Sequence, residues 1–121
     1  MTETRPSKIY DLEDRTFEFA RRCRAFVKTL PRTLANIEDG KQLIRSSGSV
    51  GANYIEANEA LSKKDFLMRT KICRKEAKES RYWLRLVDTG AKQEIDRERA
   101  SLVQEATELT KIFGSIIRKS E

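Results

Sequence analysis

The sequence predicts an all-α protein that folds as an antiparallel up-down four-helix bundle. Only two of its 121 residues are proline and five are glycine, so the chain has few points at which a helix must stop. Four segments carry apolar residues at alternating steps of four and three, which places these residues on one face of a helix. No segment shows the period-two alternation of a half-buried strand. Helices of this kind, joined by short connections, pack as antiparallel neighbours.

The length allows one domain with one core. We therefore expect a single four-helix-bundle domain over residues 1–121, with residues 1–10 as an N-terminal tail.

No run of about 18 apolar residues could span a membrane, and the N-terminus lacks the apolar centre of a secretory signal. The two cysteines, Cys23 and Cys73, lie far apart on apolar stripes, as core residues of a reducing compartment would. These features predict a cytoplasmic protein with no membrane partner.

The first helix is predicted from about Asp11 to Leu30, and Pro31 closes it. The second is predicted from about Thr33 to Leu61. The expected core face of the first consists of Leu12, Thr16, Phe19, Cys23, Phe26 and Leu30. The expected core face of the second includes Val50, Tyr54, Ala57 and Leu61.

The stretch "RSSGSVGANYIEAN", residues 45–58, allows three interpretations. A nucleotide-binding loop would need a strand before it and a Lys-Ser or Lys-Thr pair after it, and neither is present. A helix break is more plausible, since each glycine costs about 1 kcal/mol in a helix. The apolar register nevertheless continues from Leu43 and Ile44 to Val50, so we favour an uninterrupted helix. Its small side chains would form a slim waist at Ser46, Ser47, Gly48, Gly51 and Ala52.

The third helix is predicted to begin at an N-cap, Ser62 or Asp65, and to run to about Thr89, with Gly90 as its stop. The fourth is predicted from about Glu94 to Arg118, with Gly114 costing some order near its end. The third presents Cys73, Ala77, Ser80, Leu84 and Val87 to the core. The fourth presents Ile95, Leu102, Ala106, Leu109, Phe113 and Ile116.

The segment "QLIRSSGSVGANYIEA" resembles the signature of the four-helix-bundle family named for proteins encoded in intervening sequences of 23S ribosomal RNA genes. The family pattern is approximately Q-L-x-R-A-x-x-S-I-P-x-N-I-A-E-G. It is matched by Gln42, Leu43, Arg45, Ser49, Asn53 and Glu56. Phe66, Ile72 and Glu79 fit a second family run in the third helix. Gly51 stands at the family's proline and Ala57 at its last glycine, and the E-x-Y-G-L usual before Gln42 is missing.

The resemblance implies an antiparallel bundle that assembles into a ring, typically a homopentamer, with no enzymatic activity and no cofactor. A related branch, the accessory protein of diversity-generating retroelements, forms a basic pentameric barrel that binds nucleic acid and a reverse transcriptase. RNA or a ribosomal particle is accordingly an expected partner.

Positive charge is concentrated in the third helix. Between Ser62 and Arg85 there are nine basic and three acidic residues, so this helix alone carries an excess equal to the net charge of +6 of the whole chain. A single stripe is formed by Lys71, Arg74, Lys75, Lys78, Arg81 and Arg85. Such a stripe is either a solvated helix face or a nucleic-acid-binding surface that contacts phosphates without reading sequence. A smaller cluster on the first helix offers modest support: Arg21, Arg22, Arg24 and Lys28.

Acidic residues on three helices suggest a less plausible alternative, an all-carboxylate metal site. The candidates are Glu56, Glu59, Glu76, Glu79, Glu105 and Glu108. The chain has no histidine, which excludes the Glu-x-x-His sites of di-iron bundles and any catalysis by a histidine base. We therefore expect no metal and no catalytic residue.

Some polar residues are expected to have structural roles. Glu79, together with Glu56, is predicted to pair with Arg45 and Asn53 across the contact of the second and third helices. Tyr82 and Trp83 are interpreted as core or subunit-interface residues in preference to base-stacking ones. The resulting hypothesis is a non-catalytic ring-forming scaffold that binds RNA or a ribonucleoprotein. The alternative is a protein–protein adaptor with no nucleic-acid role.

Overall fold

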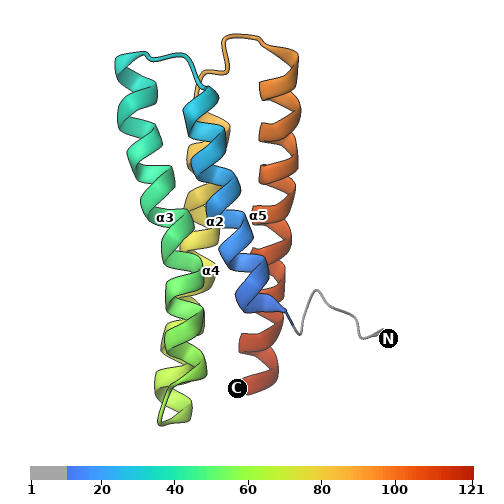
Figure 1. Ribbon diagram of the computed structural model, residues 1–121. Coiled ribbons are helices and arrows are strands. Elements are labelled where there is room, and N and C mark those ends of the chain that lie inside the picture. The colour runs from blue at the N-terminus through green and yellow to red at the C-terminus, as the bar shows by residue number, and fades with distance from the viewer. Residues whose placement is uncertain (1–10) are drawn as a thin grey trace, which may run out of the picture.

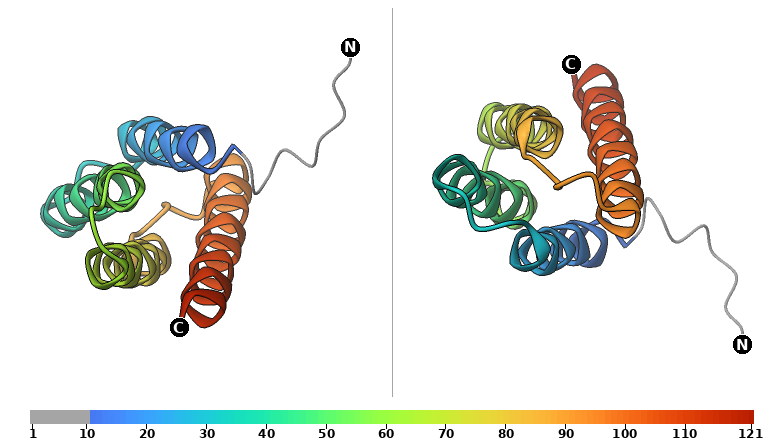
Figure 2. Two further views of the ribbon diagram at one scale, coloured as in Figure 1. Left: turned by 90° about the horizontal axis from the view of Figure 1, so that it is seen from below. Right: turned by 90° about the horizontal axis from the view of Figure 1, so that it is seen from above.

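The computed structural model describes residues 11–121, which form four helices and no strand. The helices are α2 (Leu12–Thr29), α3 (Leu34–Asn58), α4 (Lys63–Leu86) and α5 (Gln93–Ser120). They run alternately up and down with short connections (Figure 1). Viewed end-on, α2 contacts α3 and α5, while α4 lies diagonally opposite α2 (Figure 2). The predicted fold class is confirmed, and the predicted tail at residues 1–10 lies outside the described residues.

The core is built from the predicted apolar faces. All the residues expected to face the core from α2, and all those expected from the third helix, are buried. Burial raises the pKa of the thiols of Cys23 and Cys73 to about 12, so both behave as inert core residues at neutral pH. The prediction for Leu61 is wrong, because α3 ends at Asn58 and leaves Leu61 98% exposed. Gly114 does not end α5, which continues to Ser120.

The slim waist of α3 is confirmed as continuous helix, and it accepts close neighbours on two sides. Toward α4, the buried hydroxyls of Ser46 and Ser80 lie 2.8 Å apart in a hydrogen bond. Toward α2, a Cβ added at Gly51 would lie 2.9 Å from Oγ1 of Thr16, too close for an undisturbed contact. A Cβ at Gly48 would meet only the guanidinium of Arg24, at 3.3 Å. A side chain at Gly51 would therefore collide with Thr16, whereas one at Gly48 would meet only a flexible arginine.

We expect opposite effects from alanine at these two glycines. Gly48→Ala should raise the free energy of unfolding by up to about 1 kcal/mol, because alanine is the better helix former and the exposed Arg24 can move aside. Gly51→Ala should lower it by about 1 kcal/mol, because overpacking against the buried, hydrogen-bonded Thr16 outweighs that gain. Urea denaturation of both variants at one protein concentration tests this. Stabilisation by both substitutions would contradict the close contact at Gly51.

The helix starts follow ordinary capping chemistry. The side chain of Thr33 accepts a hydrogen bond from the backbone N–H of Asn36 and thereby caps α3. Ser62 caps α4 by accepting from the N–H of Asp65, so Ser62 is the N-cap of the two candidates.

The end of α4 differs from the prediction. The helix stops at Leu86 because Val87 adopts extended backbone, three residues before Gly90. The carbonyl of Val87 accepts a hydrogen bond of 2.6 Å from Nη1 of Arg99 on α5. Gly90 has a φ of +69° and turns the following loop instead of ending the helix. Arg99, from the next helix, therefore provides a hydrogen-bond donor to a backbone carbonyl at the end of α4.

Asn36 links the two loops at the same end of the bundle. Its side chain is buried, and Nδ2 donates to the carbonyl of Pro31 at 2.9 Å and to that of Asp88 at 2.8 Å. Its Oδ1 accepts from the N–H of Asp88 at 2.9 Å. One amide therefore joins the α2–α3 connection to the α4–α5 connection.

None of the helices within residues 11–121 has the length and apolar character required to cross a lipid bilayer.

Candidate nucleic-acid interface

The basic stripe of α4 is a continuous exposed surface. We use this name for Lys71, Arg74, Lys75, Lys78, Arg81 and Arg85, all of which are exposed. Spacings of three and four residues place them on one side of the helix, away from the buried Ala77 and Leu84. The structure therefore brings the six predicted residues together on one face.

Most charges of the basic stripe are not neutralised within residues 11–121. Lys71 lies 3.8 Å from a carboxylate oxygen of Glu121, and Lys75 lies 3.6 Å from one of Glu76. Both lysines are more than half exposed, and ion pairs of that kind contribute little. The remaining four members form no ion pair with any other residue of the described part: Arg74, Lys78, Arg81 and Arg85.

A shallow hollow lies along the N-terminal two-thirds of the basic stripe. Its lining combines four of the six cations with one carboxylate and one aromatic ring: Lys71, Arg74, Lys75, Lys78, Glu79 and Tyr82. Tyr82 is 56% exposed and is therefore not a core residue, while the alternative interpretation as a subunit-interface residue stays a prediction. Trp83 beside it is partly buried and packs against the core, as expected.

The second basic cluster does not extend the basic stripe. It lies on α2, diagonally across the bundle from α4 (Figure 2). Arg21 pairs with Glu18 at 2.5 Å, and Arg22 pairs with Glu98 at 3.2 Å and donates to the Ser101 hydroxyl. Half of this cluster is therefore already neutralised, and it does not strengthen the interface on α4.

Arg45 of α3 joins two carboxylates of α4. Its Nη2 donates to Oε1 of Glu79 at 2.5 Å and to Oε1 of Glu76 at 3.2 Å. The hydrogen bond to Glu76, with the charges of both carboxylates, raises the pKa of Arg45. The predicted pairing of Arg45 with Glu79 is confirmed. The role of Glu76, which is only 4% exposed and depends on this arginine, was not predicted.

The other polar residues of the α3 signature act differently from the prediction. Asn53 does not pair with Glu79. Its Nδ2 donates to the carbonyl and hydroxyl oxygens of Ser49, both at 2.9 Å, and its Oδ1 accepts from Arg69 at 3.1 Å. Glu56 is exposed and makes no ion pair within residues 11–121, so its predicted pairing is wrong. Gln42 is likewise exposed.

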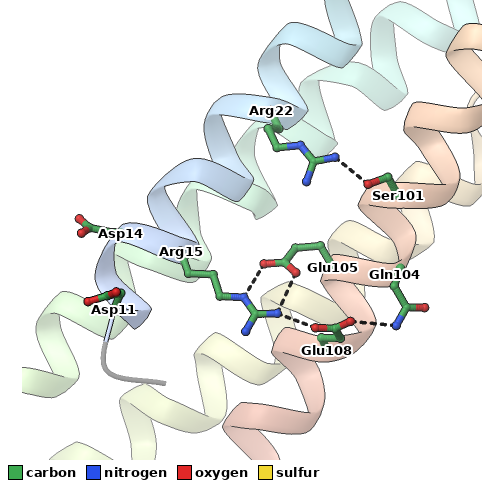
Figure 3. A pocket seen from close by; sticks show the side chains of 8 residues that line it. All are labelled: Asp11, Asp14, Arg15, Arg22, Ser101, Gln104, Glu105 and Glu108. Atoms are coloured by element: carbon green, nitrogen blue, oxygen red, sulfur yellow. Dashed lines mark hydrogen bonds and ion pairs between the residues drawn. The ribbon is translucent and has the colours of Figure 1, made fainter. Parts of the chain in front are cut away.

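A further arginine, not singled out from the sequence, connects α2 to α5. Arg15 points toward α5 and lies between two carboxylates (Figure 3). It makes a two-bond contact with Glu105, at 2.7 and 2.9 Å, and a third bond of 2.7 Å with Glu108. The hydrogen bond to Glu105 outweighs burial and raises the pKa of Arg15. Its side chain is 12% exposed, which makes this a largely buried cluster.

The six acidic residues considered as metal ligands are not gathered at one place. Glu76 and Glu79 contact Arg45, whereas Glu105 and Glu108 contact Arg15 on the α2–α5 side. In the described part of the chain, no three acidic or thiol side chains are arranged to hold a metal ion.

Comparison with known proteins agrees with this architecture. The family model of the 23S rRNA-intervening sequence proteins matches residues 10–115. The chain belongs to this family. A similar solved structure is that of a protein of unknown function from the S23 ribosomal protein family of Bacteroides thetaiotaomicron. The two chains are 36% identical with a TM-score of 0.75, over 87% of this chain and 96% of the other. No curated protein matches the chain.

In this member of the family, several of the signature residues join helices. Arg45 and Asn53 connect α3 to α4, and Ser49 holds the amide of Asn53. Gly51, where the family pattern has proline, lies against Thr16 of α2. These signature residues therefore hold α3 against its neighbours, and the six cations of the basic stripe lie outside the signature.

Proposed function

We propose that this protein is a non-catalytic scaffold of the cytoplasm, which assembles into a homopentameric ring and binds RNA or a ribonucleoprotein through the basic stripe of α4. The observation that carries the proposal is that four cations of the basic stripe are exposed and unpaired within the described residues: Arg74, Lys78, Arg81 and Arg85. They are exposed, lie on one helix face and have no carboxylate partner within residues 11–121. Clustered cations of this kind bind phosphates by releasing counterions.

The chemistry of the remaining residues is consistent with binding and not with catalysis. The chain has no histidine, and four of its clustered carboxylates are held by arginines. Both cysteines are free and buried, which suits a reducing cytoplasm. Since no side-chain motif for reading base edges accompanies the basic stripe, binding should depend on the backbone and only weakly on sequence.

An apolar groove between α2 and α3 supports self-association. It is lined by small and apolar residues that include Phe17, Ala20, Gly48, Gly51, Ala52 and Ile55. Phe17 is 68% exposed and Ile55 51%, so water contacts a large apolar area that a second copy would cover. The groove and the basic stripe lie on different sides of the bundle.

Analytical ultracentrifugation tests the ring. We expect a mass five times the 14.0 kDa of one chain, and a shift to smaller species for Phe17→Glu. Leu34→Glu is the matched control, because Leu34 is 79% exposed but lies outside the groove. A wild-type mass of one chain would overturn the ring, and a Phe17→Glu variant that keeps the wild-type mass would exclude this groove as the contact.

RNA binding is tested by fluorescence anisotropy over a range of salt concentrations. We expect log Kd to rise with log salt concentration by about 0.7 for each phosphate contacted on a single strand. The combined variant Arg74→Glu, Lys78→Glu and Arg81→Glu should bind at least about tenfold more weakly.

The matched control carries the same change in charge on other helices: Lys28→Glu, Arg97→Glu and Lys111→Glu, at exposed positions of α2 and α5. Equal weakening by both triple variants would show that only net charge matters. Absence of binding at low salt would overturn the proposed function in favour of a protein–protein adaptor.

A further inference from the structure

Tyr82 is an exposed aromatic residue near the C-terminal end of the basic stripe. It lines the same hollow as Arg74, Lys75 and Lys78. Lys78 precedes it by four residues and Arg85 follows by three, so cations lie about one helical turn to either side of it. The ring is therefore accompanied by positive charge in both directions along α4.

The ring of Tyr82 contacts that of its neighbour Trp83. It packs against Trp83 with the ring centroids 4.9 Å apart and the planes at 83°, an edge-to-face arrangement. Trp83 is itself packed against the hydrophobic core. Tyr82 is 56% exposed, so Trp83 and the other neighbours leave much of the residue open to solvent. The ring therefore packs against an anchored neighbour and is still accessible to a ligand.

From this arrangement we infer that Tyr82 is a stacking surface for an unpaired base, and that the ligand of the basic stripe is single-stranded nucleic acid. The inference rests on the proposed function and specifies its ligand. Surfaces that bind single strands combine cations that follow the backbone with aromatic faces on which bases stack. A duplex offers phosphates to the cations but keeps its bases stacked on one another, so Tyr82 would add little to its binding.

A subunit contact centred on Tyr82 is the competing explanation. The three lysines that line the hollow with Tyr82 argue against it, because the centres of protein interfaces are depleted of lysine. Arg74, Lys78, Arg81 and Arg85 have no carboxylate partner within residues 11–121, and inside such a contact they would lose their hydration without gaining one from their own chain's described part. A polyanion supplies that partner.

The test uses the intact protein and one RNA of about 20 nucleotides without self-complementarity, offered alone and as a duplex with its complement. Tyr82→Leu removes the aromatic face but keeps an apolar side chain, and should weaken single-strand binding about five- to a hundredfold. Its affinity for the duplex should change less than about twofold. Tyr82→Phe keeps the ring and should bind both RNAs like the wild type.

The outcomes separate this inference from the proposed function. Stacking is overturned if Tyr82→Leu leaves single-strand binding unchanged or weakens the binding of both RNAs equally. The proposed function is still supported in that case if the triple charge reversal weakens salt-dependent binding at least about tenfold. If the wild type binds neither RNA, both the proposed function and the stacking inference are overturned. A smaller oligomer for Tyr82→Leu in ultracentrifugation would identify Tyr82 as a subunit contact and also overturn stacking.

Discussion

Replacing Arg15 by methionine is expected to lower the free energy of unfolding by about 3 kcal/mol. The guanidinium lies between Glu105 and Glu108 of α5 with three hydrogen bonds, and only 12% of the arginine side chain and 18% of that of Glu105 are exposed. Methionine retains the length and most of the packing of the side chain. The loss of stability therefore comes mainly from Glu105, because its largely buried carboxylate would no longer have a cation to pair with.

Arg21→Met is the matched control, since Arg21 also contacts a carboxylate with two nitrogen atoms, that of Glu18. Here the arginine and glutamate side chains are 63% and 48% exposed, so we expect a change within about 0.5 kcal/mol. Urea denaturation of both variants at one protein concentration, at low and high salt, measures the difference. If the two substitutions have equal effects, the Arg15 cluster does not stabilise the α2–α5 contact.

The second large effect is expected for Asn36→Ala, about 2 kcal/mol of lost stability. The buried amide makes three hydrogen bonds to the backbones of two loops, and alanine would leave two carbonyls and one N–H to find other partners. The cost arises from backbone groups that a small methyl group cannot satisfy.

Two further variants define the role of Asn36. Asn36→Asp keeps the acceptor for the N–H of Asp88 but turns a carboxylate oxygen toward the two carbonyls, so it should not restore stability. Asn58→Ala removes an exposed asparagine that bonds to Glu13, and should cost no more than about 0.5 kcal/mol. Thermal unfolding at neutral pH is a sufficient readout. Wild-type stability of Asn36→Asp would show that the two donated bonds are unimportant.

The parts of the fold that depend on local pattern could be predicted from the sequence. The core face of α2 follows directly from its four-three spacing, because helix geometry alone decides which residues share a face. The same geometry places the cations from Lys71 to Arg85 together on one exposed face. The continuity of α3 through Gly48 and Gly51 followed from the unbroken apolar register on either side.

The errors arise where a residue's partner is distant in the chain. Gly90 has the local features of a helix stop, but Arg99 of α5 and the extended Val87 end α4 earlier. The prediction that Glu56 pairs across the α3–α4 contact is wrong, because the sequence does not show how α3 is rotated about its own axis relative to α4. Asn36 gives no local signal for its role, since Asp88 lies 52 residues away. The spacing of residues in α4 places Tyr82 among the cations, but it does not show that the side chain is exposed to solvent.

The separation of the apolar groove from the basic stripe has a consequence for affinity. Because α4 lies across the bundle from α2, protomers that meet through the groove would leave every stripe open to solvent. A strand long enough to reach a neighbouring protomer would then experience a high effective concentration of the next stripe. Residence time would then increase in steps with strand length, although each protomer alone would hold its few nucleotides only briefly.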